Sequence, residues 1–150
     1  MSVEIIGIDH IYIAVSDLER SEHFYDRFME GLGFRKGRST IEGEPHVHYY
    51  NRHFGFTLRP ARDTSAEHDP YGPGLHHLCF RVLDETAIDR AARMLRDNQI
   101  DVSEPRYYAE YSKDYYAVFF SDPDGVRLEI NNFWQRRRER MFDWDAEAQE

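Results

Sequence analysis

The sequence predicts an α+β fold in which two βαβββ modules form a cupped, partly open barrel of mixed sheet, with the helices outside. Two observations predict this fold. A strand–helix segment occurs twice along the chain, and three shorter strand-like runs follow each copy. Because neither copy could bury its sheet face alone, we expect the two copies to pair within one domain of 150 residues. Its parts are module 5–62, module 74–133, and a C-terminal helix with an acidic tail over 134–150.

The repeat begins at two histidines. His10 and His77 open matching strands at an offset of 67 residues. In both strands an apolar residue occupies every second position after the histidine, which is the period of a half-buried strand. The residues that close the strands match at the same offset; these are Val15 with Val82 and Asp17 with Asp84.

Each of these strands leads into a predicted helix. In the first copy Ser16 and Glu19 have the spacing of a capping box, an apolar stripe follows, and Gly33 ends the helix. In the second copy the apolar stripe covers 88–95. A turn-rich linker at 69–74 joins the two copies. The shorter strands are expected at 34–38, 46–50, 54–58, 100–102, 115–121 and 126–130.

Composition excludes several classes of partner. The formal net charge of −9 argues against nucleic acid or an anionic membrane as the main partner. Aromatic residues make up 15% of the chain, which is too many for a disordered protein. No apolar run approaches the ~20 residues of a membrane-spanning helix. No signal peptide opens the chain, and the single cysteine, Cys79, allows no internal disulfide. We therefore expect a cytoplasmic protein.

Alternation along the strands places three potential metal ligands away from the apolar core. His10 and His77 fall on the concave face, and the repeat makes them symmetry mates. Glu129 falls on the non-core side of the last strand, between apolar neighbours. Two imidazoles and one carboxylate are a ligand set for Fe(II), Mn(II), Zn(II) or Ni(II), with positions left open for substrate and water. Each residue alone also fits an ordinary strand position, so the predicted site depends on the three together.

Four segments resemble the vicinal oxygen chelate superfamily, which includes glyoxalase I, extradiol dioxygenases, fosfomycin-resistance enzymes and bleomycin-binding proteins. The resemblance covers residues 5–133 and implies paired βαβββ modules, usually in a homodimer, with one divalent metal ion in the cupped sheet. The ligand positions of the superfamily fall on His10, His77 and Glu129. The matching segments are 8–15, 21–34, 74–82 and 122–129, the last of which contains an Asp-Pro-Asp-Gly turn.

The resemblance implies a metal-dependent lyase or transferase of the glyoxalase or fosfomycin-resistance type. Its ion would act as a Lewis acid on a small substrate with vicinal oxygens. Thr57 stands where glyoxalase I carries a carboxylate that also serves as its proton-transfer base, and no acidic residue occurs over 51–62. A three-ligand site is instead similar to those of fosfomycin-resistance transferases and extradiol dioxygenases.

Two alternatives remain open. An Fe(II) extradiol-type ring-cleaving dioxygenase would carry a tyrosine where this chain has Phe119. Other tyrosines and histidines could substitute, namely Tyr115, Tyr116 and His48 or His53. A metal-free small-molecule binding protein, similar to bleomycin-resistance proteins, would use the same fold without an ion. No residue can be assigned a catalytic proton-transfer role from the sequence.

Six residues from both modules are candidates for substrate binding: Tyr12, Thr57, Arg81, Tyr115, Phe119 and Arg138. Arg138 stands near the place where fosfomycin-type enzymes hold a phosphonate. The competing interpretation makes the basic run 135–141 a solvated face of the C-terminal helix. We expect His46, His48 and His53 to be exposed strand and loop residues.

Overall fold

The computed structural model describes residues 2–147, so Met1 and the end of the predicted acidic tail, 148–150, lie outside the described residues. The chain divides into two compact units. Unit 1 comprises the chain up to His68 together with Asp122–Asp124, and unit 2 comprises Asp69–Ser121 together with the chain from Gly125 onward. The pairing of the two modules within one domain stays a prediction.

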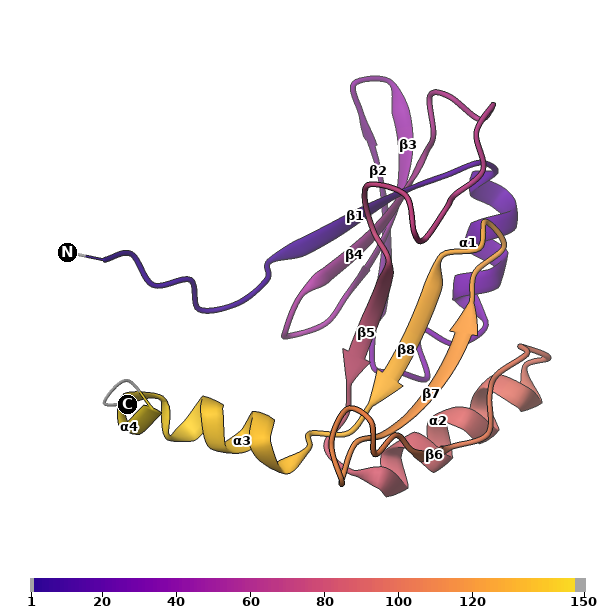
Figure 1. The fold of residues 1–150 in the computed structure, drawn as a ribbon. Helices are drawn as coiled ribbons and strands as arrows, with labels where there is room; N and C mark the ends of the chain where they lie inside the picture. The colour runs from indigo at the N-terminus through magenta and orange to yellow at the C-terminus, as the bar shows by residue number, and fades with distance from the viewer. Residues whose placement is uncertain (1, 148–150) are drawn as a thin grey trace. The chain divides into compact units, whose positions relative to one another are not determined.

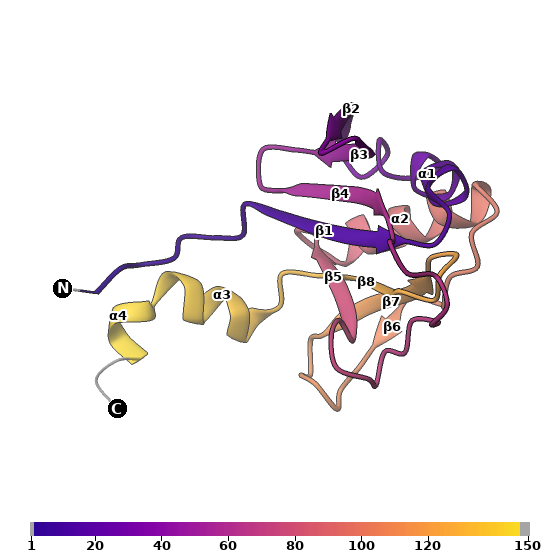
Figure 2. The same ribbon diagram turned by 90° about the horizontal axis from the view of Figure 1, so that it is seen from above.

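Unit 1 holds a four-stranded sheet in the order β1-β4-β3-β2 (Figure 1). Strands β1 and β4 are parallel and lie side by side, with their arrows pointing the same way in Figure 2. Strand β3 is antiparallel to both of its neighbours, and α1 packs against β4. The elements are β1 (His10–Val15), α1 (Leu18–Asp26), β2 (Arg35–Ile41), β3 (Glu44–Tyr50) and β4 (Gly55–Pro60).

Unit 2 repeats this topology with a sheet in the order β5-β8-β7-β6. Strands β5 and β8 are parallel, β7 is antiparallel to both of its neighbours, and α2 packs against β7 and β8. The elements are β5 (His77–Arg81), α2 (Glu85–Asp97), β6 (Arg106–Tyr107), β7 (Tyr116–Ser121) and β8 (Arg127–Asn131), followed by α3 (Gln135–Phe142) and α4 (Trp144–Glu147). The predicted α+β class and the βαβββ order of both modules are confirmed.

One predicted strand is wrong. The run 100–102 was expected to pair in the second sheet, but β6 lies at Arg106–Tyr107 and Val102 forms only an isolated bridge. The reason is the way α2 ends. Gln99 adopts a φ of 60°, and the backbone N–H of Ile100 donates to the carbonyl of Leu95 across 2.9 Å. Ile100 is buried directly after this closing turn, so its apolar character reports a helix end rather than a strand.

Equivalent aspartates begin the two helices. Asp17 and Asp84 each accept a hydrogen bond from the backbone N–H three residues later, as N-cap residues do. The capping box predicted at Ser16 is therefore wrong by one residue. Both the N–H and the hydroxyl of Ser16 donate instead to the carboxylate of Asp124, which belongs to the Asp-Pro-Asp-Gly turn.

The apolar core of each unit lies between its sheet and its helix. Along β1, Ile13 and Val15 are buried while His10 and Tyr12 are exposed, which confirms the predicted alternation. The core of unit 1 is centred on the fully buried side chains of Tyr25, Phe28, Phe56 and Leu58. The core of unit 2 is centred on those of Ile88, Leu95, Leu128 and Ile130.

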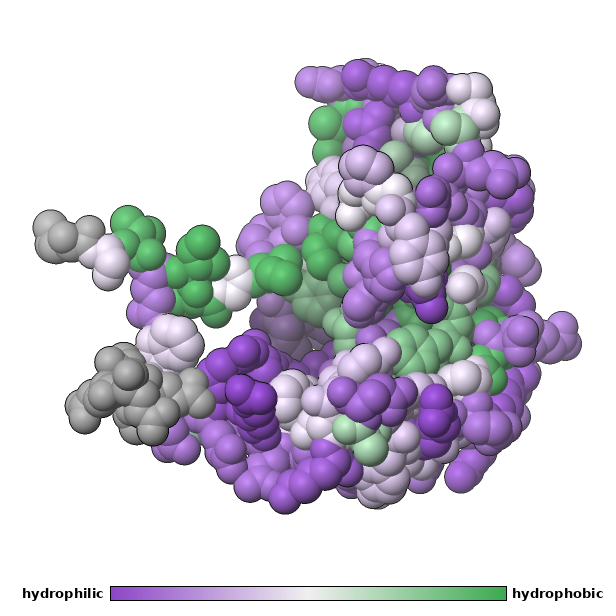
Figure 3. Space-filling model, in the orientation of Figure 1, coloured by the Kyte–Doolittle hydropathy of each residue, from purple (hydrophilic) through white to green (hydrophobic). Residues whose placement is uncertain are grey.

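The surface is apolar before β1 and strongly polar along α3. Figure 3 shows a green group of side chains on the N-terminal segment, where Val3 and Ile6 are more than nine-tenths exposed. Helix α3 has no buried residue and is purple in the same view. Over the part of the chain that the structure describes, no helix combines the length and apolarity needed to cross a membrane.

Candidate functional site

His77 and Glu129 come together in unit 2. They project from the parallel neighbours β5 and β8, and the Nε2 atom of His77 lies 3.4 Å from Oε2 of Glu129. The side chain of His77 is 43% exposed, whereas that of Glu129 is only 3% exposed. The carboxylate of Glu129 is therefore buried, and the imidazole of His77 lies on its solvent-exposed side. Two of the three predicted metal ligands are thus adjacent within one unit.

Two protonated groups surround the Glu129 carboxylate. The Tyr115 hydroxyl donates to Oε1 across 2.5 Å, and Cys79 lies directly opposite Glu129 in the register of β5 and β8. Burial raises the pKa of the Tyr115 hydroxyl above its usual value, and the bond to Glu129 raises it further. Burial also raises the pKa of the Cys79 thiol, and the charge of Glu129 adds to the effect. Both groups therefore keep their protons at neutral pH and carry no charge. The protonated thiol of Cys79 is a poor nucleophile.

His10, the third predicted ligand, lies at the start of β1 in unit 1. Its Nδ1 lies 2.7 Å from Oδ2 of Asp9. His77 is held in the same way in unit 2, because its Nδ1 lies 2.8 Å from Nδ1 of His76. In both histidines the preceding residue occupies Nδ1 and leaves Nε2 for another partner. This is how metal-ligating histidines are commonly oriented by a neighbouring group. Sequence reasoning missed Asp9 and His76, although each stands directly before a repeated histidine.

Register makes Thr57 the counterpart of Glu129. In unit 1 Tyr12 pairs with Thr57, and in unit 2 Cys79 pairs with Glu129. Tyr12 and Cys79 each follow the repeated histidine by two positions, so the two pairs are equivalent. Thr57 is 3% exposed and carries a hydroxyl where unit 2 has its carboxylate. This register agrees with the position that the resemblance to glyoxalase I gives Thr57.

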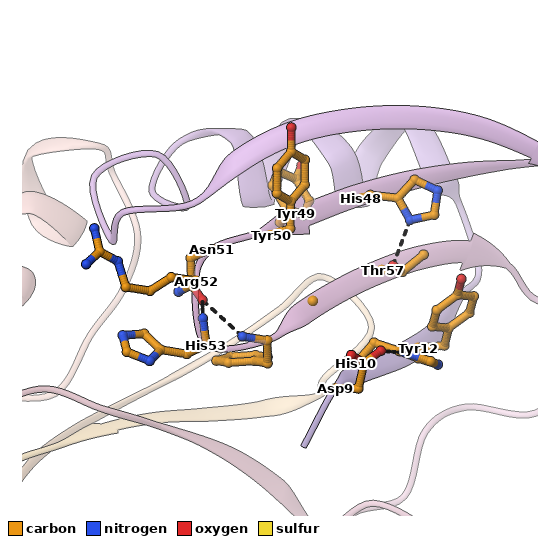
Figure 4. Close-up of a pocket in the computed structure, with 12 residues that line it drawn as sticks. Asp9, His10, Tyr12, His48, Tyr49, Tyr50, Asn51, Arg52, His53 and Thr57 are labelled. Atoms are coloured by element: carbon orange, nitrogen blue, oxygen red, sulfur yellow. Dashed lines mark hydrogen bonds and ion pairs between the residues drawn. The ribbon is translucent and has the colours of Figure 1, made fainter. Parts of the chain in front are cut away.

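A pocket of about 450 Å³ lies on the same face of unit 1 (Figure 4). Its walls are rich in aromatic rings and imidazoles, and its floor is made by the start of β4. In Figure 4, Tyr12, Thr57 and His48 lie in one row across three strands, at the opposite end of the pocket from Arg52 and His53. The residues that line it are Asp9, His10, Tyr12, His48, Tyr49, Tyr50, Asn51, Arg52, His53, Phe54, Gly55 and Thr57.

The expectation that His46 and His48 are exposed is wrong. His46 is 3% exposed, and its Nδ1 bonds to the backbone carbonyl of Glu44. His48 is half-buried between two hydroxyl groups, with Nδ1 2.9 Å from Oγ1 of Thr57 and Nε2 2.6 Å from Oγ of Ser39. Burial lowers the pKa of His48, and His46 lowers it further. Alternation along β3 gave no signal of this burial, because 46, 48 and 50 share the face opposite the core residues Val47 and Tyr49, and Tyr50 on that face is exposed.

The remaining predicted substrate residues lie in unit 2. The guanidinium of Arg81 stacks over the ring of Phe133, with its carbon 4.4 Å from the ring centroid. Arg138 also lies over Phe133 and donates to the backbone carbonyls of Phe133 and Leu83. Phe119 lies opposite Glu129 in the register of β7 and β8. Arg138 therefore contacts the backbone just before α3 and just after β5.

Among the residues that the structure describes, neither unit by itself holds three side chains grouped for a metal ion. Over residues 2–147, no group of three His, Cys, Asp or Glu side chains that could hold a metal ion occurs within unit 1 or within unit 2. Of the predicted ligands, unit 2 offers Nε2 of His77 and Oε2 of Glu129, and unit 1 offers Nε2 of His10. The three-ligand set of His10, His77 and Glu129 therefore stays a prediction.

Known proteins resemble the chain over most of its length. The profile of the family described as the Glyoxalase/Bleomycin resistance protein/Dioxygenase superfamily matches residues 7–130. A metallothiol transferase FosB from Staphylococcus epidermidis is 26% identical over 129 residues, which cover 86% of this chain and 83% of that protein.

Solved structures share the fold. A glyoxylase/bleomycin resistance protein/dioxygenase domain from Frankia superposes with a TM-score of 0.71 at 20% identity, covering 86% of this chain and 98% of the other. The fosfomycin resistance protein FosX from Listeria monocytogenes, a mutant complexed with Mn(II) and 1S,2S-dihydroxypropylphosphonic acid, superposes with a TM-score of 0.65 at 14% identity. That superposition covers 90% of this chain and 98% of FosX. At these identities the structures show a common fold.

Proposed function

The chain belongs to the glyoxalase/bleomycin resistance/dioxygenase superfamily, and from this premise we propose that it is a metal-dependent enzyme of the glyoxalase or fosfomycin-resistance type. Its substrate is a small molecule with vicinal oxygens. His10, His77 and Glu129 are the proposed ligands of one divalent ion, and the enzyme is proposed to act as a homodimer in the cytoplasm. Relatives named as a metallothiol transferase and as a fosfomycin resistance protein with bound Mn(II) support this class of reaction.

The arrangement of His77 and Glu129 is the observation that carries the proposal. The imidazole Nε2 and the carboxylate Oε2 are 3.4 Å apart, and the hydrogen bonds to His76 and Tyr115 use the other nitrogen of the ring and the other oxygen of the carboxylate. Tyr115 holds the second carboxylate oxygen, and His76 holds the second imidazole nitrogen. Two donor atoms oriented in this way fit a small divalent cation.

The charge of Glu129 also fits a bound cation. A buried carboxylate is costly unless a positive charge or several hydrogen bonds compensate for its lost hydration. Within unit 2 the groups around this carboxylate are a phenol, a thiol and an imidazole, none of which carries a permanent positive charge. A divalent ion held by His77 and Glu129 would supply the missing charge.

When bound, the ion supplies Lewis-acid polarisation of a substrate oxygen. The other proposed roles belong to side chains. Tyr12 and Thr57 line the pocket of unit 1 and position the substrate there. Phe119 and Arg81 are proposed to bind substrate from unit 2, and Tyr115 orients the carboxylate of Glu129. Arg138 is the proposed contact for an anionic substrate group.

Elemental analysis of the purified protein tests the proposal. We expect about one equivalent of a divalent metal in protein prepared without chelator, and loss of that metal in Glu129→Ala. Glu104→Ala is the matched control, because the side chain of Glu104 is 83% exposed in the same unit. Equal metal content in Glu129→Ala and Glu104→Ala contradicts the proposal. A wild-type protein without metal that still binds a small ligand, with unchanged affinity in His77→Ala, favours the metal-free binding module.

An oxygen-uptake assay distinguishes the ring-cleaving dioxygenase from the proposed reaction. The protein is loaded with Fe(II) under anaerobic conditions and then mixed with catechols in aerated buffer. We expect no oxygen consumption above that of the Glu129→Ala protein, because β7 presents Phe119 opposite Glu129 instead of a tyrosine. Rapid, Glu129-dependent uptake would replace the proposed reaction by an extradiol-type one.

A further inference from the structure

We infer that His48 is the proton acceptor of the proposed reaction, and that it takes the proton of an α-hydroxycarbonyl substrate through the hydroxyl of Thr57. The inference rests on the proposed metal-dependent function and adds the group that moves the proton. It is carried by a continuous chain of three polar groups in unit 1 that leads from the pocket to the surface.

Three neighbouring strands hold this chain of groups. Thr57 on β4 lies directly opposite His48 on β3, and its Oγ1 is 2.9 Å from the imidazole Nδ1. The imidazole Nε2 is 2.6 Å from the hydroxyl oxygen of Ser39 on β2. Thr57 is buried on the pocket floor and Ser39 is exposed to solvent. The chain of groups therefore connects the pocket with bulk water.

The imidazole is suited to accept a proton. Its low pKa keeps it neutral at pH 7, and a neutral imidazole has one donor and one acceptor nitrogen. If Nε2–H donates to Ser39, then Nδ1 accepts the hydroxyl proton of Thr57. The other titratable rings near His48 are His46, stacked at 6.1 Å on the same strand, and Tyr12 of β1 at 6.5 Å.

The chain of groups also lies on the side of the sheet that carries the proposed metal ligand. His10, Tyr12, Thr57 and His48 line the same pocket, and the Tyr12 ring lies between the other two rings, 5.2 Å from that of His10. His48 thus lies near the proposed reaction centre without contacting His10.

The proposed proton transfer needs no reactant besides the substrate, Thr57, His48 and water. The proton of the C–H bond beside the substrate carbonyl moves to Oγ1 of Thr57, and the hydroxyl proton of Thr57 moves to Nδ1 of His48. The electron pair of the C–H bond forms the double bond of an enediolate, and the carbonyl oxygen takes the negative charge. Return of the proton to the carbon that lost it restores the substrate. Its delivery to the neighbouring carbon, with transfer of the hydroxyl proton to the negatively charged oxygen, gives the isomer. The proton held on the imidazole exchanges with water through Ser39.

Deuterium exchange into a defined probe tests the inference. Hydroxyacetone is incubated with Zn²⁺-loaded protein in D₂O, and loss of its hydroxymethyl proton signal is followed by NMR. We expect His48→Gln to slow the protein-catalysed exchange by about 100-fold or more, as removal of a general base does. His23→Gln, which changes an exposed histidine on α1, should exchange at the wild-type rate.

A second readout does not depend on turnover. Long-range ¹H–¹⁵N spectra report the charge and tautomer of each imidazole. We expect His48 to be neutral at pH 7 with its proton on Nε2, and we expect Thr57→Val to leave Zn²⁺ affinity unchanged while it slows exchange. A positively charged His48 at pH 7, or a proton on Nδ1, would overturn the inference.

The outcomes separate this inference from the proposed function. If the wild-type protein binds Zn²⁺ and His48→Gln still catalyses exchange, His48 is not the acceptor while the metal site stands. If the wild-type protein binds Zn²⁺ but catalyses no exchange, the α-hydroxycarbonyl substrate class is wrong. If the wild-type protein binds no Zn²⁺, the proposed function fails and this inference fails with it.

Discussion

The hydroxyl of Tyr115 donates a hydrogen bond to Glu129 across 2.5 Å, on the carboxylate oxygen that His77 does not face. The phenol thereby fixes which oxygen of the buried carboxylate remains available. Outer groups of this kind orient a ligand without touching the metal.

Replacement of Tyr115 by phenylalanine should weaken metal binding while the fold is kept. Loss of such an orienting partner costs about 10- to 100-fold in metal affinity, because Glu129 is then free to rotate. Calorimetric titration with Mn²⁺ or Zn²⁺ measures the change. Tyr107→Phe is the control, since Tyr107 lies exposed on β6. Equal affinities in the two variants would show that Tyr115 does not orient a ligand.

Thr57→Glu should restore a carboxylate at the position equivalent to Glu129. If the register equivalence reflects a shared site, a fourth ligand will strengthen metal binding by about tenfold or more, since an added charged ligand raises the affinity of a site for a cation. Thr40→Glu on the exposed strand β2 is the matched control. The comparison needs circular dichroism to show that both variants fold. A folded Thr57→Glu protein with unchanged or weaker metal binding contradicts the shared site.

Asp17→Ala and Asp84→Ala should each destabilise the protein by about 1 kcal/mol, the usual cost of losing an N-cap side chain. Both aspartates accept the backbone N–H three residues later at the start of α1 or α2. Urea unfolding of the two variants measures the loss, and Ser16→Ala is the comparison because Ser16 has the spacing of a capping box with Glu19. A larger effect from Ser16→Ala than from Asp17→Ala would argue against the observed cap.

Tyr25→Phe should cost about 1–3 kcal/mol of unfolding free energy, because it leaves a buried carboxylate with one hydrogen bond fewer. The Tyr25 hydroxyl donates to Oδ2 of Asp122 across 3.0 Å, and both side chains are buried. Phe28→Leu is a comparison in the same core that removes apolar contacts but no hydrogen bond. A Tyr25→Phe protein as stable as the wild type would mean that Asp122 finds another partner.

Stability should fall on acidification in a way that depends on His48. The pKa of His48 is lowered in the folded protein, so the folded state binds this proton less tightly than the unfolded state does. The contribution of His48 is therefore fully present above the unfolded pKa of about 6.5 and is lost as the pH falls through the folded value. Urea unfolding at pH 7.5 and 5.5 should show a smaller acid loss in His48→Gln than in His23→Gln. Identical losses would contradict the lowered pKa.

The fold could be predicted because each copy of the repeat contains a strand pattern followed by a helix pattern. Alternating apolar residues after His10 and His77 identify the first strand of each module, and the helical stripes that follow identify α1 and α2. The strand expected at 100–102 failed because an apolar residue that closes a helix end looks the same in sequence as one in a strand. Periodicity in the sequence predicts that a residue is buried, but it does not predict which contacts bury that residue.

The candidate site could be predicted only in part. The face of each ligand follows from strand parity, and so does the Thr57 position. The contacts that hold the donor atoms do not follow from strand parity. Those made by Asp9, His76 and Tyr115 depend on side-chain rotamers. The imidazole of His48 appears as a strand residue in sequence, and its two hydroxyl partners come from separate strands. Such cross-strand networks become visible only once the strand register is known.

Anomalous diffraction from crystals grown with Mn²⁺ tests the central claim most directly. The proposal requires one anomalous peak bonded to Nε2 of His10, Nε2 of His77 and a carboxylate oxygen of Glu129, at full occupancy. A peak that touches only one of these side chains, or a peak elsewhere on the molecule, would contradict the metal site and leave the protein with the fold alone.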